Sequence, residues 1–237
     1  MPRPALVGRV AQARAKLVLV DAPAGYGKTT LIAQWRGSAA DGRPFAWVSL
    51  DPDDNDPVSL WSHVAHALHR ARPELGIQPI LAALRAQPPD IDGAMLPILV
   101  NELNALPGPV VLVLDDYHRV KERSCHGHVE YLLCHLPPMV QLVLATRADP
   151  PLPLARLRST GDMVELRMSE LRFTLAEAAA LINRTAGIRL ADHDLADLVG
   201  ADRGLARRSL SRRAFPARSP VSRQLRPAVQ WQQPVCR

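Results

Sequence analysis

Apolar and polar residues alternate in blocks along most of the chain, and the blocks predict strands separated by helices. Short apolar runs bounded by turn-forming or charged residues predict strands at 16–21, 44–50, 110–114, 140–145 and 163–166. The run at 110–114 is apolar throughout, which is typical of a strand buried on both faces. Strands that alternate with helices form a parallel, doubly wound sheet. We therefore expect an α/β fold with a five-stranded parallel sheet flanked by helices.

Helical periodicity fills several of the intervening segments. Pro57 suits a first helical position after Asp56 as N-cap. The buried face of that helix should carry Leu60, Val64, Ala67 and Leu68. Further helical patterning covers 78–106, with a break at Pro88 and Pro89. Residues 1–15, in contrast, predict a short polar lead-in.

The last part of the chain changes in composition. Helices are predicted at 174–183 and 192–199, the first opened by a capping box of Thr174 and Glu177. Residues 200–237 carry nine Arg and one acid, a net charge of +8, so the preceding residues carry −2 of the total of +6. We expect a folded domain at 1–200 and a disordered Arg/Ser/Pro-rich tail at 201–237.

A Gly-rich stretch between the first strand and the next helix has the pattern of a phosphate-binding loop. It consists of Ala22, Pro23, Ala24, Gly25, Tyr26, Gly27, Lys28, Thr29 and Thr30. A turn of this kind lets successive backbone N–H groups converge on an anion at a helix start. Lys28 would reach the β- and γ-phosphates, and the Thr29 hydroxyl would bind Mg²⁺. Ala22 stands where the general motif has glycine, so an ordinary turn is the alternative.

Charged residues follow two of the other predicted strands. Asp115 and Asp116 come directly after the apolar run at 110–114, as in the Mg²⁺-binding strand of nucleotide hydrolases. Arg147 follows the strand at 140–145. If that strand lies between the phosphate-loop strand and the acidic strand, Arg147 faces the γ-phosphate. A polar turn and a surface arginine are the plain alternatives.

Two groups of residues invite a metal interpretation. His63, His66 and His69 fall on one predicted helix, but solvated helix surface explains them better. The second group is Cys125, His126, His128, Cys134 and His135. It lacks a paired short Cys spacing, so helix surface with a core cysteine is preferred over zinc.

Composition excludes several classes of function. Although 47% of the residues are apolar, no uninterrupted run approaches the roughly 20 residues of a membrane span. Three cysteines are too few and too irregular for a disulfide framework. The part before Gly200 is faintly acidic, which disfavours a nucleic-acid-binding patch there. We expect a cytoplasmic protein without membrane association.

Taken together, these motifs resemble the ATPase domain of MalT-like large LuxR-family transcriptional regulators, which are signal-transduction ATPases with numerous domains. The resemblance covers Arg3 to about Gly200, and Ala22 matches the family's own variant of the loop. Besides the loop it rests on Trp47-Val48-Ser49-Leu50-Asp51, Leu112-Val113-Leu114-Asp115-Asp116-Tyr117-His118, Ala145-Thr146-Arg147, Leu152-Pro153-Leu154-Ala155-Arg156-Leu157-Arg158 and Leu171-Arg172-Phe173-Thr174. It implies a P-loop NTPase fold.

The resemblance also implies a switch that rests with ADP and self-associates with ATP. By position, the loop and Lys28 would hold the phosphates, and Thr29 and Asp115 the Mg²⁺. Asp116 would orient the attacking water, and Arg147 would sense the γ-phosphate. Complete family members continue into a winged helix, a helical-repeat sensor and a helix-turn-helix that binds DNA. None of these is recognised here, so we expect a truncated chain without specific DNA binding.

The segment after Gly200 departs from the resemblance. The family would continue with Thr-Glu-Gly-Trp, whereas this chain has Asp202-Arg203-Gly204-Leu205. Permissible codons for 202–218, read one base forward, begin Thr-Glu-Gly-Trp-Pro-Gly-Gly-Leu. We therefore expect a frameshift near Gly200, genuine or from sequencing, which the coding DNA tests. Three functions stay open: a slowly hydrolysing switch domain, an inert fragment, and a small ATPase whose basic tail contacts nucleic acid.

Overall fold

The computed structural model describes residues 2–38, 41–172 and 177. The chain divides into two units, Met1–Phe173 and Thr174–Arg237, and the helices and strands given below all lie in the first. The helices expected at 174–183 and 192–199, their capping box and the tail at 201–237 lie outside the described residues, apart from Glu177.

A five-stranded parallel sheet forms the centre of the first unit. Its strands are β1 (Leu17–Asp21), β2 (Phe45–Ser49), β3 (Val110–Asp115), β4 (Val140–Thr146) and β5 (Met163–Arg167). The order is β2-β3-β4-β1-β5, and each neighbouring pair is parallel. The predicted sheet is therefore confirmed, and β4 lies between β1 and β3 as expected.

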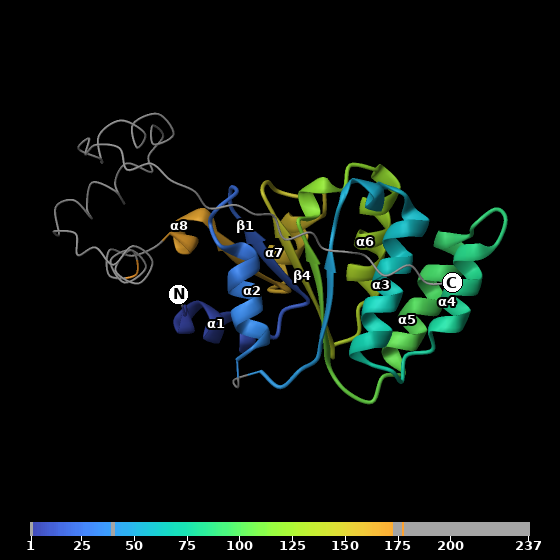
Figure 1. The fold of residues 1–237 in the computed structure, drawn as a ribbon, viewed down its shortest axis with the longest axis horizontal. Helices are drawn as coiled ribbons and strands as arrows, with labels where there is room; N and C mark the ends of the chain where they lie inside the picture. Colours follow the sequence, from blue (N-terminus) through green and yellow to red (C-terminus); the bar gives the residue numbers. More distant parts are fainter. Residues whose placement is uncertain (1, 39–40, 173–176, 178–237) are drawn as a thin grey trace, which may run out of the picture. The chain divides into compact units, whose positions relative to one another are not determined.

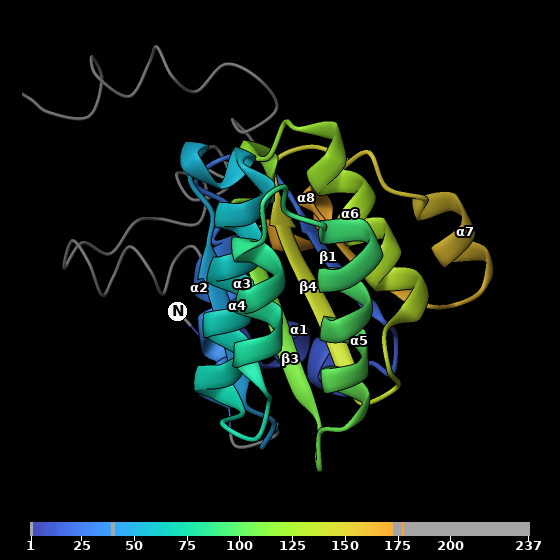
Figure 2. The same cartoon turned by 90° about the vertical axis from the view of Figure 1, so that its right-hand side faces the viewer.

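Helices cover both faces of the sheet (Figure 1). On one face lie α1 (Pro4–Ala11), α2 (Lys28–Arg36) and the short α8 (Met168–Leu171). On the other lie α3 (Pro57–Ala71), α4 (Ile77–Arg85), α5 (Leu96–Asn104), α6 (Arg123–His135) and α7 (Leu154–Ser159). Figure 2 looks onto this second layer, with α3 to α6 in front of the strands. Short helical turns occupy Pro52–Asn55, Ile91–Met95 and Tyr117–Arg119.

The alternation of side chains along the strands builds two hydrophobic cores. Leu17 and Leu19 of β1 pack with the α3 to α7 layer, whereas Val18 and Val20 pack with α1 and α2. Each of these four side chains is at most 1% exposed. Successive strand residues point to opposite faces, so a strand covered on both sides must be apolar throughout. This explains why the strand runs carry no polar alternation.

The start of the chain differs from the expected lead-in, because Pro4–Ala11 form helix α1. Pro4 occupies a first-turn position, and Val7 and Val10 are buried against the α2 side of the sheet. Their spacing of three residues was the signal for a helix face. Arg3 is 8% exposed and donates to the carbonyl oxygens of Leu171 at 2.7 Å and Arg172 at 2.6 Å. The segment is therefore part of the core.

The predicted α3 face is confirmed. Its four apolar positions are buried, and the Asp56 side chain caps the helix by accepting from the Ser59 N–H at 2.8 Å. His63 and His66 are exposed on the opposite side. Among the residues that the structure describes, no cluster of three or more His, Cys, Asp or Glu could hold a metal ion.

Helix α6 gives a second correction, because His126 and His128 are buried instead of lying on the helix surface. The Nδ1 atom of His126 lies 2.9 Å from the Tyr117 hydroxyl. The Nδ1 atom of His128 accepts from the Trp61 indole at 3.2 Å, and its Nε2 lies 3.3 Å from Asp92. Burial lowers the pKa of both imidazoles. Polar partners inside the layer make the burial of neutral rings tolerable.

None of the described helices is both long enough and apolar enough to cross a lipid bilayer.

Candidate functional site

Three central strands end at the same edge of the sheet and bring the predicted site residues together. The loop at 22–27 follows β1, Asp115 and Asp116 end β3, and Arg147 follows β4. Strand β1 is aligned with β4 so that Asp21 lies opposite Thr146. In open parallel sheets, ligands bind at the carboxyl ends of the strands. Strand pairing therefore brings residues that are far apart in the sequence to the same edge of the sheet.

The loop turns sharply between β1 and α2. Gly25 and Gly27 have φ angles of 88° and 75°, in the left-handed region that favours glycine. The Ala22 N–H donates to the Thr146 carbonyl oxygen at 3.3 Å, which ties the loop to β4. Gly27 is the N-cap of α2 and provides no side-chain cap. The first-turn amides of α2 thus point towards the carboxyl ends of the strands, as at an anion-binding helix start.

Lys28 is the first residue of α2, and its side chain folds back over the loop. The residue is 7% exposed, and Nζ donates to the carbonyl oxygens of Ala22 at 2.7 Å and Pro23 at 3.1 Å. Burial, followed by the nearby Arg147 charge, lowers the pKa of the ammonium, although Asp116 and Asp115 act in the opposite sense. The cation is held inside the loop by two neutral carbonyls, and these can be exchanged for an anion.

Thr29 and Asp115 form a direct pair. The Thr29 hydroxyl donates to Asp115 Oδ2 at 2.9 Å, and the Asp116 N–H donates to Oδ1 at 3.0 Å. Asp115 is 4% exposed, and its burial raises the pKa of the carboxyl despite the Thr29 hydrogen bond. A hydroxyl and one carboxylate fit Mg²⁺, which keeps several waters and takes its other ligands from phosphates. The Thr29 hydroxyl and the Asp115 carboxylate therefore suit this ion.

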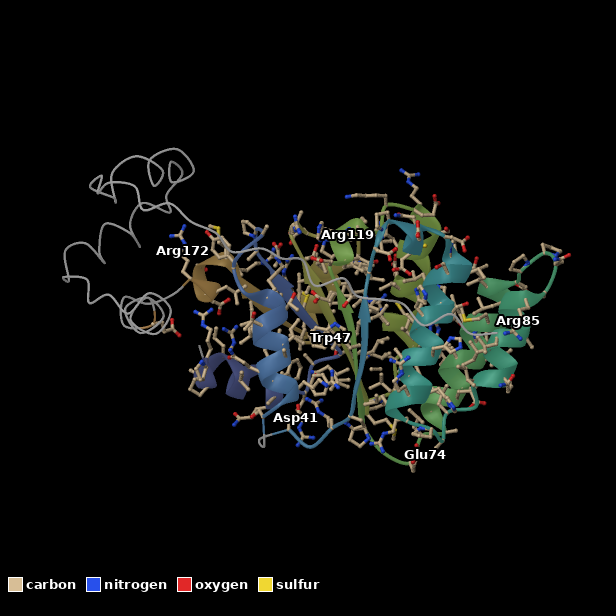
Figure 3. All side chains as sticks on the ribbon, viewed as in Figure 1. Asp41, Trp47, Glu74, Arg85, Arg119 and Arg172 are labelled. Atoms are coloured by element: carbon tan, nitrogen blue, oxygen red, sulfur yellow. The ribbon has the colours of Figure 1, made fainter. Side chains whose placement is uncertain are left out.

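Asp116 has an unusual backbone conformation. Its φ of 59° is the left-handed value that asparagine and aspartate tolerate best among non-glycine residues. The side chain is 35% exposed, with carboxylate oxygens 3.7 Å from His118 Nδ1 and 3.8 Å from Arg119 Nε. Figure 3 shows Arg119 at the same end of the molecule as the carboxyl ends of the strands. Asp116 is thus placed beside Asp115 but open to solvent.

Arg147 lies exposed at the tip of β4. Its charge lowers the pKa of Lys28 and, after burial, that of His118, which places the guanidinium within electrostatic range of both. It forms no ion pair with any residue that the structure describes. The positive charge is therefore available to an anion at the site. The run at 112–118 indicates no role for His118, whose Nδ1 lies 3.7 Å from the Asp116 carboxylate in the structure.

A second charged cluster at this edge was missed from the sequence. Arg167, the last residue of β5, donates to Asp21 Oδ2 at 2.6 Å, to Glu165 Oε2 at 2.7 Å and to Asp149. Asp21 and Arg167 are opposite each other in the β1–β5 pair but 146 positions apart in the chain. No local pattern marks this contact, because only the sheet brings the two strands together.

Comparison with known proteins identifies relatives. Over 197 residues the chain is 34% identical to the serine/threonine-protein kinase PknK of Mycobacterium tuberculosis (strain H37Rv). The match covers 81% of this chain and 17% of that protein. It is 33% identical over 207 residues to the HTH-type transcriptional regulator MalT of Yersinia enterocolitica, covering 87% and 22%. For MalT of Serratia proteamaculans the identity is 36% over 163 residues, covering 69% and 18%. The chain thus spans about a fifth of the length of these relatives.

Two solved structures share the fold. One is a Signal Transduction ATPase with Numerous Domains with a tetratricopeptide repeat sensor from Pyrococcus horikoshii (TM-score 0.56, 16% identity), covering 84% of this chain and 27% of that chain. The other is Cdc6p from Pyrobaculum aerophilum (TM-score 0.50, 14% identity), covering 82% and 51%. No family model matches the chain. The chain is therefore a member of the family formed by one segment of the MalT regulators and of PknK, and it has the P-loop ATPase fold.

Proposed function

We propose that this chain is the ATP- and ADP-binding switch domain of a MalT-type regulator. The observation that carries the proposal is the position of Lys28, buried over the loop carbonyls beside the Thr29–Asp115 pair. A desolvated ammonium, outward helix amides and a hydroxyl–carboxylate pair at one strand edge make a site for a polyphosphate with Mg²⁺. The name of the MalT relatives, an HTH-type transcriptional regulator, supports the regulatory context.

Each residue then has a defined part. The amides of the loop and Lys28 hold the phosphates, and Lys28 exchanges the Ala22 and Pro23 carbonyls for phosphate oxygens. Thr29 and Asp115 hold Mg²⁺, which neutralises charge on the phosphates. Asp116, half-buried beside Asp115, orients a water molecule for a slow hydrolysis. Arg147, which has no ion-pair partner in the described part, pairs with the γ-phosphate.

The switch follows from this arrangement. Arg147 and the Asp115–Asp116 turn would contact the γ-phosphate of ATP but lose it in ADP, so the two nucleotides differ in the contacts they make. Self-association of the ATP form is the regulatory output that we propose, in line with what the resemblance described above implies.

Calorimetric titration of the full chain with ADP and with ATP, each with Mg²⁺, tests the proposal. The wild-type chain should bind both nucleotides with saturation, and Lys28→Ala should lose most of this affinity. Lys121→Ala, at an exposed lysine that follows the Tyr117–Arg119 turn, is the matched control and should bind as the wild type does. Equal affinity in the Lys28 variant, or no binding by a chain whose circular dichroism shows it folded, would overturn the proposal.

A further inference from the structure

Strand β2 lies at one edge of the sheet and has an open side. It pairs with β3 alone among the strands that the structure describes. The Val111 N–H donates to the Pro44 carbonyl oxygen at 3.0 Å, and the Leu50 N–H donates to the Asp115 carbonyl oxygen at 2.9 Å. Residues 44, 46, 48 and 50 therefore point their backbone groups towards β3, because these groups alternate along a strand.

The intervening residues point their backbone groups the other way. Phe45, Trp47 and Ser49 direct their N–H and C=O groups to the outer side of β2. An unpaired edge of this kind is a template for another strand, and proteins commonly blunt such edges with prolines, bulges or a covering segment. Within the described part, β2 has Pro44 only at its entrance and no bulge in its register with β3.

A groove runs beside this edge between α2 and α3. One cavity of about 670 Å³ is lined by Arg36, Arg43, Phe45, Trp47 and Arg70, among others. A second of about 250 Å³ shares Trp47 and Arg70 and continues along Ser49 to His63 and His66. Figure 3 shows Trp47 in the space between α2 and β2. The outer side of β2 thus borders this groove, which the half-buried Trp47 ring lines.

The charge of the groove is positive. Arg36 and Arg70 are exposed, and neither forms an ion pair within the part of the chain that the structure describes. Arg43 is paired with Asp41 at 2.6 Å, so its charge is compensated. The two uncompensated arginines flank β2 from α2 and from α3, one on each side of the strand. A ligand lying along the edge would contact both.

We propose that an extended acidic peptide segment of a partner protein binds here by adding a strand to β2. The outward N–H and C=O groups of Phe45, Trp47 and Ser49 would pair with its backbone, as in strand-addition complexes. Carboxylates on successive residues of the added strand point to opposite faces of the sheet, so one would meet Arg36 on the α2 side and the next would meet Arg70 on the α3 side. The positive charge of the groove would attract an acidic peptide or a nucleic acid alike. Only the peptide has a backbone that can pair with the outer N–H and C=O groups of β2, so we favour the peptide.

The test uses a fluorescein-labelled nine-residue peptide that repeats Glu-Glu-Thr, which puts carboxylates on both faces of the added strand, with binding measured by fluorescence anisotropy against the full chain. Arg36→Glu combined with Arg70→Glu should weaken binding at least tenfold. Arg85→Glu is the matched control, since Arg85 is an exposed arginine on α4 remote from β2 in Figure 3, and it should change affinity less than twofold.

A second variant pair tests strand addition itself. Ser49→Pro removes an outward N–H but leaves the ladder to β3 intact, so it should weaken binding about tenfold. Ser49→Ala removes the hydroxyl but keeps the N–H, and should bind as the wild type does. The same peptide N-methylated at alternate backbone nitrogens should not bind. Lys28→Ala should bind the peptide normally, so failure of this proposal is separate from failure of the nucleotide site.

Several results would overturn the proposal. Absence of binding, equal binding of the N-methylated peptide, or equal affinity of Ser49→Pro would each show that no strand is added. Competition by polyuridylate RNA as effective as by unlabelled peptide at equal charge would show a non-specific anion surface instead.

Discussion

Two charged clusters lie side by side at the carboxyl ends of the strands, and their charges are compensated differently. In the cluster of Arg167, Asp21, Asp149 and Glu165, the cation contacts three carboxylates. In the loop cluster, Lys28 is bound to neutral carbonyls instead. In the first arrangement each carboxylate has an arginine partner, and the contacts join β1 to β5. The second leaves charge that only a ligand can satisfy.

This difference teaches how burial separates structural from functional charges. An ion pair compensates desolvation locally, whereas a buried charge without an ion-pair partner is a cost to the folded state. The lowered pKa of Lys28 and the raised pKa of Asp115, both caused first by burial, report this cost. Perturbed groups of this kind cluster at functional sites. The predictions below test whether the two clusters differ in this way.

Lys28→Ala should have the largest effect, and on nucleotide affinity. Loss of the ammonium removes charge-assisted hydrogen bonds of about 1.5–3 kcal/mol each, so ADP and ATP affinity should fall roughly 100-fold. The free energy of unfolding without nucleotide should change little, because the ammonium forms no ion pair among the described residues and its hydrogen bonds go to two carbonyl oxygens. Calorimetry and chemical denaturation measure the two quantities. If the variant unfolded more easily but bound nucleotide normally, Lys28 would stabilise the fold and would not bind the ligand.

Arg167→Gln should have the opposite profile. Three carboxylates lose their shared cation, so the free energy of unfolding should fall by about 1–3 kcal/mol, while nucleotide affinity changes less than tenfold. Chemical denaturation gives the first and calorimetry the second. Arg156→Gln on α7, an exposed arginine without an ion pair among the described residues, serves as control and should leave both unchanged. If Arg167→Gln lost more free energy of nucleotide binding than of unfolding, the Arg167 cluster would belong to the nucleotide site as well.

Asp115→Asn should sharpen the comparison through pH. Burial raises the pKa of this carboxyl in the folded state above its ordinary 3.8. At pH values between 3.8 and the raised pKa, the folded state therefore binds more protons than the unfolded state. Stability without Mg²⁺ and nucleotide should therefore fall as pH rises from about 4 towards neutrality. The asparagine variant should lack this fall and be the more stable protein at pH 7.

The same variant should lose the Mg²⁺-dependent part of its ATP affinity, because the amide is a poorer ligand than the carboxylate. Denaturation curves at pH 4 to 8 and titrations with and without Mg²⁺ provide the data. Wild-type and variant stability that stay parallel across this range would show that Asp115 carries no burial cost.

Arg9→Ala should have the smallest effect. Arg9 pairs with Glu170, but the two side chains are 49% and 32% exposed, so solvent screens the attraction. Exposed pairs contribute about 0–1 kcal/mol, and we expect a change within about 0.5 kcal/mol in the unfolding free energy. Nucleotide affinity should stay the same. A loss as large as that of Arg167→Gln would mean that exposure does not separate these ion pairs.

Much of the fold could be predicted because its signals are local. The apolar runs around 17–21 and 110–114 mark buried strands wherever they fall, and the glycines at 25 and 27 mark a turn that needs a left-handed backbone. Helix α1 was missed because it has only eight residues, among them the helix-unfavourable Pro4 and Gly8, so its buried valines make a short signal. The burial of His126 was missed because its partner, the Tyr117 hydroxyl, lies in another element.

The sequence by itself determined the five strands, the phosphate-loop turn and the acidic end of β3, since each is a short pattern of side-chain size, polarity and backbone freedom. Only the tertiary structure decided which charges meet. Strand pairing sets Asp21 against Arg167 across 146 positions of chain, a contact that no local pattern indicated. The fold also places Thr29 beside Asp115 across 86 positions, as the resemblance implied. It also leaves the outer side of β2 unpaired within the described part. Contacts between distant residues depend on sheet order and register, which single-strand patterns do not encode.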